Sequence, residues 1–359
     1  MPPIASSPAF ATLTTVLAVI AGVLGSVYQS DIAGSFPLTW SSSTGLMSPR
    51  AVMFWSCVVA FGLMFFRRQL WDDRNRAQLE TLVRTMPPRA FQGQLAQVVT
   101  SAHRGLALIL PRSTESSITP VELAAFARTL LNSIARLALI FDDQPLTGKG
   151  SAVYSANVMI YREPATTVLS DGVTLLFSAP ESDLSKFAGL LLLRKELSAT
   201  SELAEKPEPD PGAPKIALPV PTTLKRNGRW TVLPGAPKAF LTGDVDGYSD
   251  ASTLAAWCRD KGDFQPAVID AVRTYFAEGP GSAVKSFISR PLIGAANERI
   301  GVLNVQSTRT GIIGDLDERL PVFQAMVTPL LLELTGVVSA LLKIEATNQP
   351  VGEGQVGRQ

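Results

Sequence analysis

The hydrophobic pattern of the chain divides it near residue 71 into a membrane-like part and a globular part. Residues 8–28 carry no charge, and residues 51–66 form a second apolar run that lies between Arg50 and Arg67. A helix of about 20 apolar residues crosses the hydrocarbon of a bilayer, and arginines at its ends reach the interface. We therefore expect residues 1–71 to form a transmembrane hairpin with spans at about 8–28 and 51–66.

A cleaved signal peptide is the alternative for the first apolar run. Residues 1–7 contain no Lys or Arg, and Gly25-Ser-Val27 is a poor cleavage site, so the pattern favours a retained span. Cytoplasmic flanks carry the excess of positive charge, so we expect a multi-pass protein of the inner membrane with both termini and the globular part in the cytoplasm. The basic residues on which this orientation rests all follow the second run: Arg67, Arg68, Arg74, Arg76, Arg84 and Arg89.

Periodic apolar positions predict the elements of the globular part. Residues 72–118 are predicted as a helical linker that Pro87-Pro88 breaks. The pattern Thr119-Pro-Val-Glu122 is typical of a capping box, and the apolar residues that follow it predict a helix to about Phe141. Strands are predicted at 154–161, 173–177, 187–193 and from Trp230, and helices at 251–258 and 266–276. Residues 187–193 could instead form a short buried helix.

Two polar segments lack the apolar residues that an ordered core needs. The segment from Ser198 to Arg229 contains six prolines among Glu, Asp and Lys, and we expect a disordered insertion at about 198–229. The globular domain then extends over 119–344, and residues 345–359 are expected to be a disordered tail.

The segment from Ser286 to Gln306 predicts two strands and a turn. Its two apolar runs are separated by the polar stretch 294–299, and Gly301 stands in the second run where a side chain is unwelcome. A long helix is predicted to follow, at about 315–343.

This segment resembles the closing hairpin and last helix of the GAF domain family. The resemblance lies in Ser286-x-x-x-x-Pro-Leu, then Ile300-Gly-Val-Leu-Asn-Val, then an acidic start to a long helix. It covers about 119–344 and is clearest at the end of that range. It implies an antiparallel sheet with helices on one side and a ligand pocket over the other face. The fold class expected is α+β, with the transmembrane hairpin followed by this GAF-like sheet flanked by helices.

Composition and motifs predict no enzyme, no cofactor and no metal site. The chain of 359 residues has a net charge of +1, one histidine and two cysteines, which favours no nucleic-acid partner and leaves few ligands for zinc. Ser282-Ala-Val-Lys285 matches a nucleophile spacing without its companion motifs. The aspartates at 244, 246 and 250 resemble a calcium loop that lacks its twelfth-position glutamate.

The ligand-binding subgroups of the GAF family are matched poorly. The cyclic-nucleotide subgroup implies an Asn-Lys pair where this chain has Ser307-Thr308, although Asp317-Glu318 is present. The bilin-binding subgroup implies a cysteine followed by histidine, and Cys258 precedes Arg259. The ligand is therefore left as an unknown small molecule.

The pocket is expected over the sheet face that carries Val158, Ile160, Leu292 and Val302, with the segment 240–260 beside it. Aromatic side chains supply contact area and charges fix the orientation of a ligand. On this basis the predicted ligand-binding residues are Tyr248, Asp250, Trp257 and Arg273.

A dimer is expected because the predicted helix at 316–344 is apolar on more than one face. GAF domains that this one resembles often pair such helices in a bundle, here with the helix that begins after Thr119. A third membrane span is the rival reading, and Gln324, Pro329 and Glu333 oppose it.

Two functions remain from the sequence. The first is a membrane-anchored cytoplasmic sensor or regulatory module, which binds a small molecule or a protein partner and signals through dimeric helices to a downstream protein. The alternative is a ligand-gated membrane effector whose hairpin oligomerises and perturbs the bilayer. Small residues four apart, Ala18, Gly22 and Ser26, favour close helix packing in lipid. Permeability of ligand-exposed vesicles separates the two.

Overall fold

A computed structural model of the protein describes residues 15, 19–20, 22–23, 26–27, 49–114, 118–142, 152–163, 173–176, 187–202, 207–314 and 316–348. The chain divides into two compact units, Met1–Met86 and Pro87–Gln359.

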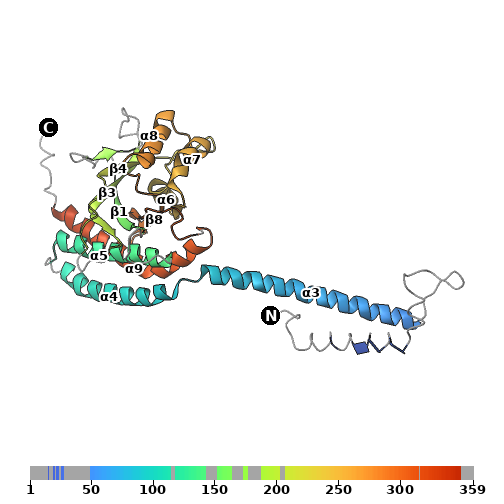
Figure 1. Ribbon diagram of the computed structural model, residues 1–359. Helices are drawn as coiled ribbons and strands as arrows, with labels where there is room; N and C mark the ends of the chain where they lie inside the picture. Colours follow the sequence, from blue (N-terminus) through green and yellow to red (C-terminus); the bar gives the residue numbers. More distant parts are fainter. Residues whose placement is uncertain are drawn as a thin grey trace, which may run out of the picture. The chain divides into compact units, whose positions relative to one another are not determined.

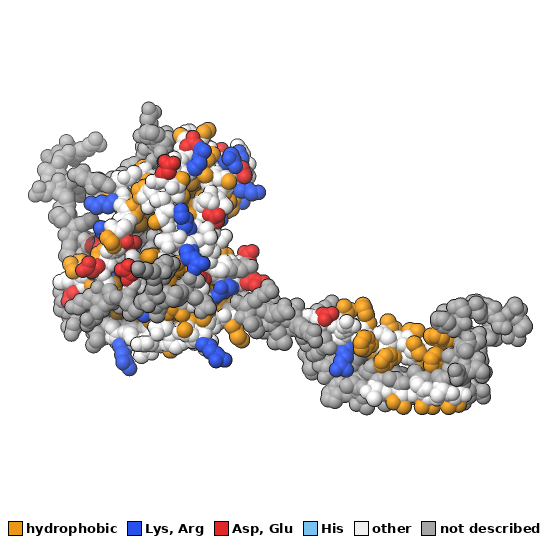
Figure 2. Space-filling model, in the orientation of Figure 1, with side chains coloured by type: hydrophobic (Ala, Val, Ile, Leu, Met, Phe, Trp, Pro, Cys, Tyr) orange, Lys and Arg blue, Asp and Glu red, His pale blue; other side chains and the backbone are white. Residues whose placement is uncertain are grey.

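The first unit contains the long helix α3 (Pro49–Thr85). The predicted apolar run 51–66 forms its beginning, and the polar residues after Arg67 continue the same helix without a break. Large apolar side chains are exposed along the first part, where Leu63 is 63% and Phe66 is 59% accessible. Figure 2 shows apolar side chains gathered along this part of α3. The other predicted span, 8–28, lies mostly outside the described residues.

Three helices form one layer of the second unit (Figure 1): α4 (Arg89–Thr114), α5 (Pro120–Phe141) and α9 (Arg319–Asn348). The break between α3 and α4 falls at Pro87-Pro88, as predicted. The capping box that starts α5 is also confirmed, because Thr119 and Glu122 satisfy each other's backbone N–H groups. Helix α4, predicted only as a linker, packs against both α5 and α9.

A curled sheet of seven strands lies against this layer, in the order β2-β4-β3-β1-β9-β8-β7. All neighbouring strands are antiparallel except β2 and β4, which are parallel. The fold is thus a mixed α and β structure. The strands are β1 (Tyr154–Arg162), β2 (Thr174–Leu175), β3 (Phe187–Thr200), β4 (Ile216–Pro221), β7 (Asp246–Tyr248), β8 (Ser286–Ile293) and β9 (Arg299–Ser307).

Shorter elements cover the opposite face of the sheet (Figure 1). They are α6 (Ala236–Thr242), the 3-10 turn η4 (Ala251–Thr253), α7 (Leu254–Lys261) and α8 (Pro266–Ala277). A small hairpin of β5 (Lys225–Arg226) and β6 (Arg229–Trp230) stands apart from the main sheet.

Alternation along the strands assigns each residue to one of the two faces. Ala156, Val158 and Ile160 of β1 belong to the core that the helices α5 and α9 share with the sheet, and so do Ile288 and Leu292 of β8. The intervening residues face the other way. The sequence prediction placed the ligand pocket on one face with Val158, Ile160, Leu292 and Val302. The first three pack with the helices, whereas Val302 packs with Met159 on the other face, so the four residues do not share a face.

The predicted hairpin of β8 and β9 is confirmed. A Cβ atom at Gly301 would lie 2.3 Å from the carbonyl oxygen of Met159 on the neighbouring β1, so the close approach of the two strands requires glycine there. Residues 187–193 are part of strand β3, and not a buried helix.

The proline-rich segment 198–229 is ordered where it is described, which corrects the predicted disorder. Its residues 216–221 form β4, which pairs with β3 along its length. The prolines 219 and 221 are tolerated because β2 pairs only with Ile216 and Ala217 on the other side of β4. Because the two prolines have no N–H group, they cannot donate to a neighbouring strand, and no described strand pairs with this part of β4 on that side.

Helix α9 is partly covered by other elements of the same chain. Leu330, Leu334 and Val338 are fully buried against α5, α4 and the sheet, whereas Leu332 is 69% exposed. The expected packing of this helix on the helix that begins after Thr119 is observed, and a dimer stays a prediction. The helix continues to Asn348, beyond the predicted start of the tail at 345.

Among the described residues, two helices are long and apolar enough to cross a membrane by length and composition, α5 and α9. Both pack against other elements of the second unit, and α5 is mostly buried there. Neither coincides with the predicted spans at 8–28 and 51–66. The transmembrane hairpin stays a prediction.

Candidate ligand cavity

A cavity of about 330 Å³ lies over the sheet face that points away from α5 and α9. Its floor is formed by alternate residues of β1, β9, β8, β3 and β4. The start of α6, the helix α8 and the segments 210–214 and 280–284 form its walls. The cavity thus lies on the opposite face of the sheet from Val158, Ile160 and Leu292, three of the four residues around which the pocket was predicted.

A chain of neutral hydrogen bonds crosses the floor from β8 to β1. The Ser289 hydroxyl donates to Asn304 Oδ1 at 2.7 Å, and Asn304 Nδ2 donates to Asn157 Oδ1 at 3.0 Å. The three side chains are at most 9% exposed, and they occupy adjacent strands in register. Buried polar groups are costly unless they are bonded, so this chain fixes the three side chains in defined orientations.

The rest of the cavity surface is mainly apolar. Met159, Leu193 and Leu218 come from the sheet, and Val272 and Phe276 come from α8. Apolar walls around a few convergent polar groups are typical of small-molecule sites, in which the polar groups set orientation.

The cavity offers little charge to a ligand. Among the described residues that line it, Asp210 is the one with an acidic or basic side chain. Its Oδ1 accepts a hydrogen bond from the backbone N–H of Gly212 at 2.9 Å. Burial raises the pKa of Tyr275 to about 12, so this phenol stays neutral. Because no Lys, Arg or His is among those lining residues, a phosphate or carboxylate group would find no cationic partner in the cavity.

The wall at 210–214 is held by polar contacts that extend to the helical layer. Arg128 of α5 donates from Nε to the carbonyl oxygen of Pro207 and from Nη1 to that of Glu196, both at 3.1 Å. The Ser198 hydroxyl accepts from the N–H of Asp210 at 3.0 Å. A displacement of this wall by a ligand would therefore strain contacts with α5.

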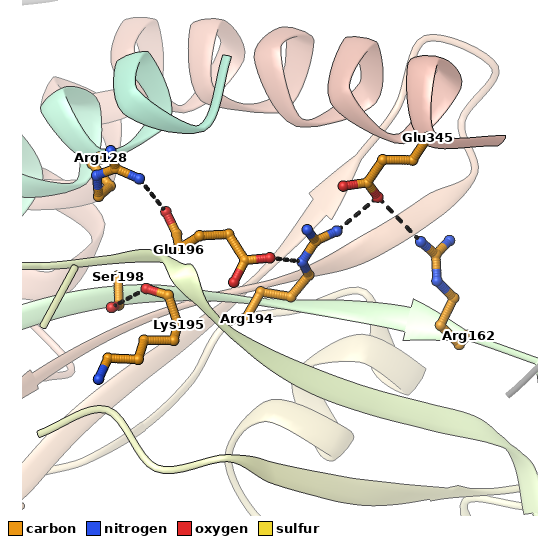
Figure 3. Close-up of polar contacts among 7 residues, drawn as sticks. All are labelled: Arg128, Arg162, Arg194, Lys195, Glu196, Ser198 and Glu345. Carbon is orange, nitrogen blue, oxygen red and sulfur yellow. Dashed lines mark hydrogen bonds and ion pairs between the residues drawn. The ribbon is translucent and has the colours of Figure 1, made fainter. Parts of the chain in front are cut away.

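Figure 3 shows that the same network reaches the end of α9. Arg194 of β3 forms an ion pair with Glu196 and another with Glu345 at 2.7 Å, and Arg162 of β1 lies 3.7 Å from Glu345. Opposite charge at Glu345 and Glu196 raises the pKa of Arg194 despite its burial. The sheet that floors the cavity is thus tied to both α5 and α9.

The opposite wall begins with a constrained turn before α6. Gly235 has φ 86°, and a Cβ there would lie 2.8 Å from the Phe287 ring. Its N–H donates to Asp246 Oδ2 at 2.7 Å, and Lys238 pairs with Asp246 Oδ1 at 2.7 Å. Asp246, part of the predicted calcium-like spacing, therefore fixes a turn. Among the described residues no group of three His, Cys, Asp or Glu side chains could hold a metal ion.

The four predicted ligand-binding residues lie around the α7–α8 region, and none is among the residues that line the cavity. Tyr248 on β7 packs on the Phe287 ring at 5.5 Å, and Asp250 accepts from the N–H of Ser252 at 2.9 Å. Trp257 on α7 lies 6.4 Å from the Trp230 ring. Arg273 on α8 is exposed and pairs with Asp270. From 240–260, only Leu254 lines the cavity. A ligand-binding role of the four residues stays a prediction.

Sequence reasoning missed the polar floor. The signal that could have found it is the alternation of polar with apolar residues inside otherwise apolar strands, as at Ser155 and Asn157 in β1 and at Asn304 and Gln306 in β9. On a buried strand these positions share one face, and a polar face on a covered sheet indicates a cavity or a network.

A scan against models of protein families finds no match to this chain. A search of curated proteins also finds no relative. The comparisons therefore identify no family, and the GAF resemblance remains an interpretation of the sequence.

Proposed function

We propose that the chain is a membrane-anchored sensor module of the GAF type, whose cavity binds an uncharged small molecule on the cytoplasmic side. The observation that carries this proposal is the cavity itself. It combines apolar walls with the hydrogen-bonded floor of Asn157, Ser289 and Asn304 and with an almost complete lack of charge. The arrangement of helices on one sheet face and a cavity over the other agrees with what the GAF resemblance implies.

The network around Arg194 supplies a route for signalling. Binding can alter a partner only if the bound and free states differ elsewhere in the protein. Arg128 of α5 bonds to Pro207, which precedes the cavity wall at 210–214, and the floor strand β3 bonds through Arg194 to Glu345 of α9. A downstream protein would read the position of the helical layer.

Membrane anchoring is supported by the exposed apolar side chains of α3, including Val59, Leu63 and Phe66. In water this surface would be unfavourable, and a bilayer would cover it. A reporter fused after Gln359 should be active in the cytoplasm. Activity of that reporter on the extracellular side of the membrane would contradict the proposed orientation.

Binding is tested by mass spectrometry of small molecules extracted from the purified full-length protein. Ala283 lines the cavity and is exposed, so Ala283→Trp should obstruct the cavity without entering the core. Ala277 on α8 is also exposed and is not among the lining residues, which makes Ala277→Trp the matched control. The proposal expects an uncharged compound to be retained by wild type and by Ala277→Trp and to be lost from Ala283→Trp. Equal retention by all three proteins would contradict it.

A further inference from the structure

A second concave site lies on the helical side of the sheet. This groove of about 430 Å³ runs between strand β8 and the first half of α9, beside the loop 243–245. Arg290 of β8 lines it. Arg290 belongs to the same strand face as Ile288 and Leu292, which pack against the helices. The groove is therefore separated from the ligand cavity by the sheet.

Arg290 lines the groove with a side-chain nitrogen that is shielded from solvent and has no hydrogen-bond partner among the described residues, its Nη1. Arg136 and Arg319 each have one such nitrogen, Nε, but neither lines this groove. Burial lowers the pKa of Arg290, and no neighbouring carboxylate offsets this effect. By contrast, Arg299 donates to the carbonyl oxygens of Phe240 and Leu241 at 2.7 and 2.6 Å.

An arginine in this position is costly to the free protein. A guanidinium stays charged at any physiological pH. Arg290 as a whole is half-buried, and its one shielded donor without a partner costs stability. Asp244 lines the same groove, but it is exposed and contributes nothing to the pKa of Arg290. An anionic group from outside the chain would remove this penalty, because the guanidinium fork matches carboxylate and phosphate oxygens.

The remaining surface of the groove indicates what else the ligand carries. Leu332 of α9 is 69% exposed and Ile293 of β8 is 43% exposed. The hydroxyls of Thr328 and Thr335 donate to carbonyl oxygens of their own helix at 2.7 and 2.8 Å. Their hydrogen atoms are therefore not available to bind the anion. A ligand with one charged end and an apolar body would cover both the arginine and the two apolar side chains.

We propose that this groove is a second binding site, for a small organic anion whose carboxylate or phosphate group pairs with Arg290 and whose apolar part packs on Leu332 and Ile293. The site is independent of the cavity, because it lies on the other face of the sheet and has the opposite charge preference. A free, soluble molecule is the occupant in this proposal, and an anionic lipid headgroup is an outcome that the test distinguishes.

The test is calorimetric titration of the full-length protein in nanodiscs of uncharged lipid. The probes are 4-phenylbutyrate, phenyl phosphate and, as the uncharged match, 4-phenylbutanol. Arg290→Met keeps an apolar side chain of similar length without the charge. Arg259→Met is the matched control, because Arg259 is exposed on α7 and lines neither the cavity nor the groove.

Wild type and Arg259→Met should bind an anionic probe about tenfold or more tightly than Arg290→Met does. Arg290→Lys should bind with intermediate affinity, because it keeps the charge and loses the fork. Without a ligand, Arg290→Met should unfold at an equal or higher temperature than wild type, since the unpaired charge is gone. Anionic lipid in the nanodiscs should leave probe binding unchanged.

Three results would overturn the proposal. They are equal binding of an anionic probe by wild type and Arg290→Met, a loss of 4-phenylbutanol binding in Arg290→Met as large as the loss of anionic-probe binding, and a lower unfolding temperature of unliganded Arg290→Met. If anionic lipid abolishes probe binding, the occupant is a lipid headgroup and the proposal of a soluble ligand is wrong. None of these results bears on the cavity, so the function proposed above can fail or stand separately.

Discussion

Replacement of Asn304 by alanine should weaken the fold through the floor of the cavity. The change removes the bond from the Ser289 hydroxyl at 2.7 Å and the bond to Asn157 Oδ1 at 3.0 Å. A neutral hydrogen bond contributes about 1 kcal/mol to stability, so the loss of two predicts a decrease of about 2 kcal/mol in the free energy of unfolding. The cavity is large enough for water to reach the two abandoned groups, which keeps the cost from rising further.

The measurement is urea unfolding of the full-length protein in mild detergent, followed by tryptophan fluorescence. A double-mutant cycle with Asn157→Ala should give a coupling energy of about 1 kcal/mol, the contribution of the one bond that joins the two amides. Gln306→Ala is the control, because Gln306 lies on the same face of the same strand outside the bonded chain. A loss below about 0.5 kcal/mol for Asn304→Ala, with no coupling to Asn157, would refute the bonded floor.

Three further predictions concern other parts of the second unit. Gly301→Ala should lower the free energy of unfolding by about 3 kcal/mol, because its Cβ would lie 2.3 Å from a backbone oxygen of β1. Gly93→Ala on α4 is the control: its Cβ meets no atom within 4 Å, and the change should stabilise the fold by about 1 kcal/mol. Equal effects of the two changes would contradict the strand register. Burial raises the pKa of Cys258 to about 12. In a Cys57→Ser variant at pH 8, iodoacetamide should therefore label Cys258 about a thousandfold more slowly than an ordinary thiol. If the folded protein is labelled as fast as the urea-unfolded protein, Cys258 is not buried. Burial also raises the pKa of Asp142, so the folded protein binds the proton more tightly than the unfolded chain does; the resulting stability is present below the usual pKa near 3.8 and is lost as the pH rises through the higher folded value. Asp142→Asn should make the free energy of unfolding depend less on pH in the range above 3.8. An unchanged dependence would argue against a raised pKa of Asp142.

The elements of the globular part followed from local patterns. The capping box at Thr119, the break at Pro87-Pro88 and the hairpin around Gly301 each depend on neighbouring residues, and the sequence predicted them. The sequence did not predict that β4 belongs to the sheet. Its prolines are tolerated only where a partner strand is short, and the pairing of strands is not a local property of the sequence.

The cavity was harder to predict because a strand pattern defines two faces without saying which elements cover each. Val158 and Ile160 were assigned to the pocket, yet α5 and α9 pack on that face. The same ambiguity led to the expectation of a dimer, since nothing in the apolar surface of α9 showed that α4 would cover part of it. The polar residues of β1 and β9 carried the relevant information, because they mark the opposite face.

The central claim is that the cavity holds an uncharged molecule, and native mass spectrometry tests it most directly. The full-length protein is released from detergent micelles after incubation with N-phenyl-1-naphthylamine, an uncharged aromatic probe, and the bound molecules are counted for each chain. We predict one probe molecule on wild type and on Ala277→Trp and none on Ala283→Trp. Equal occupancy of Ala283→Trp and wild type, or no binding to either, would contradict the account.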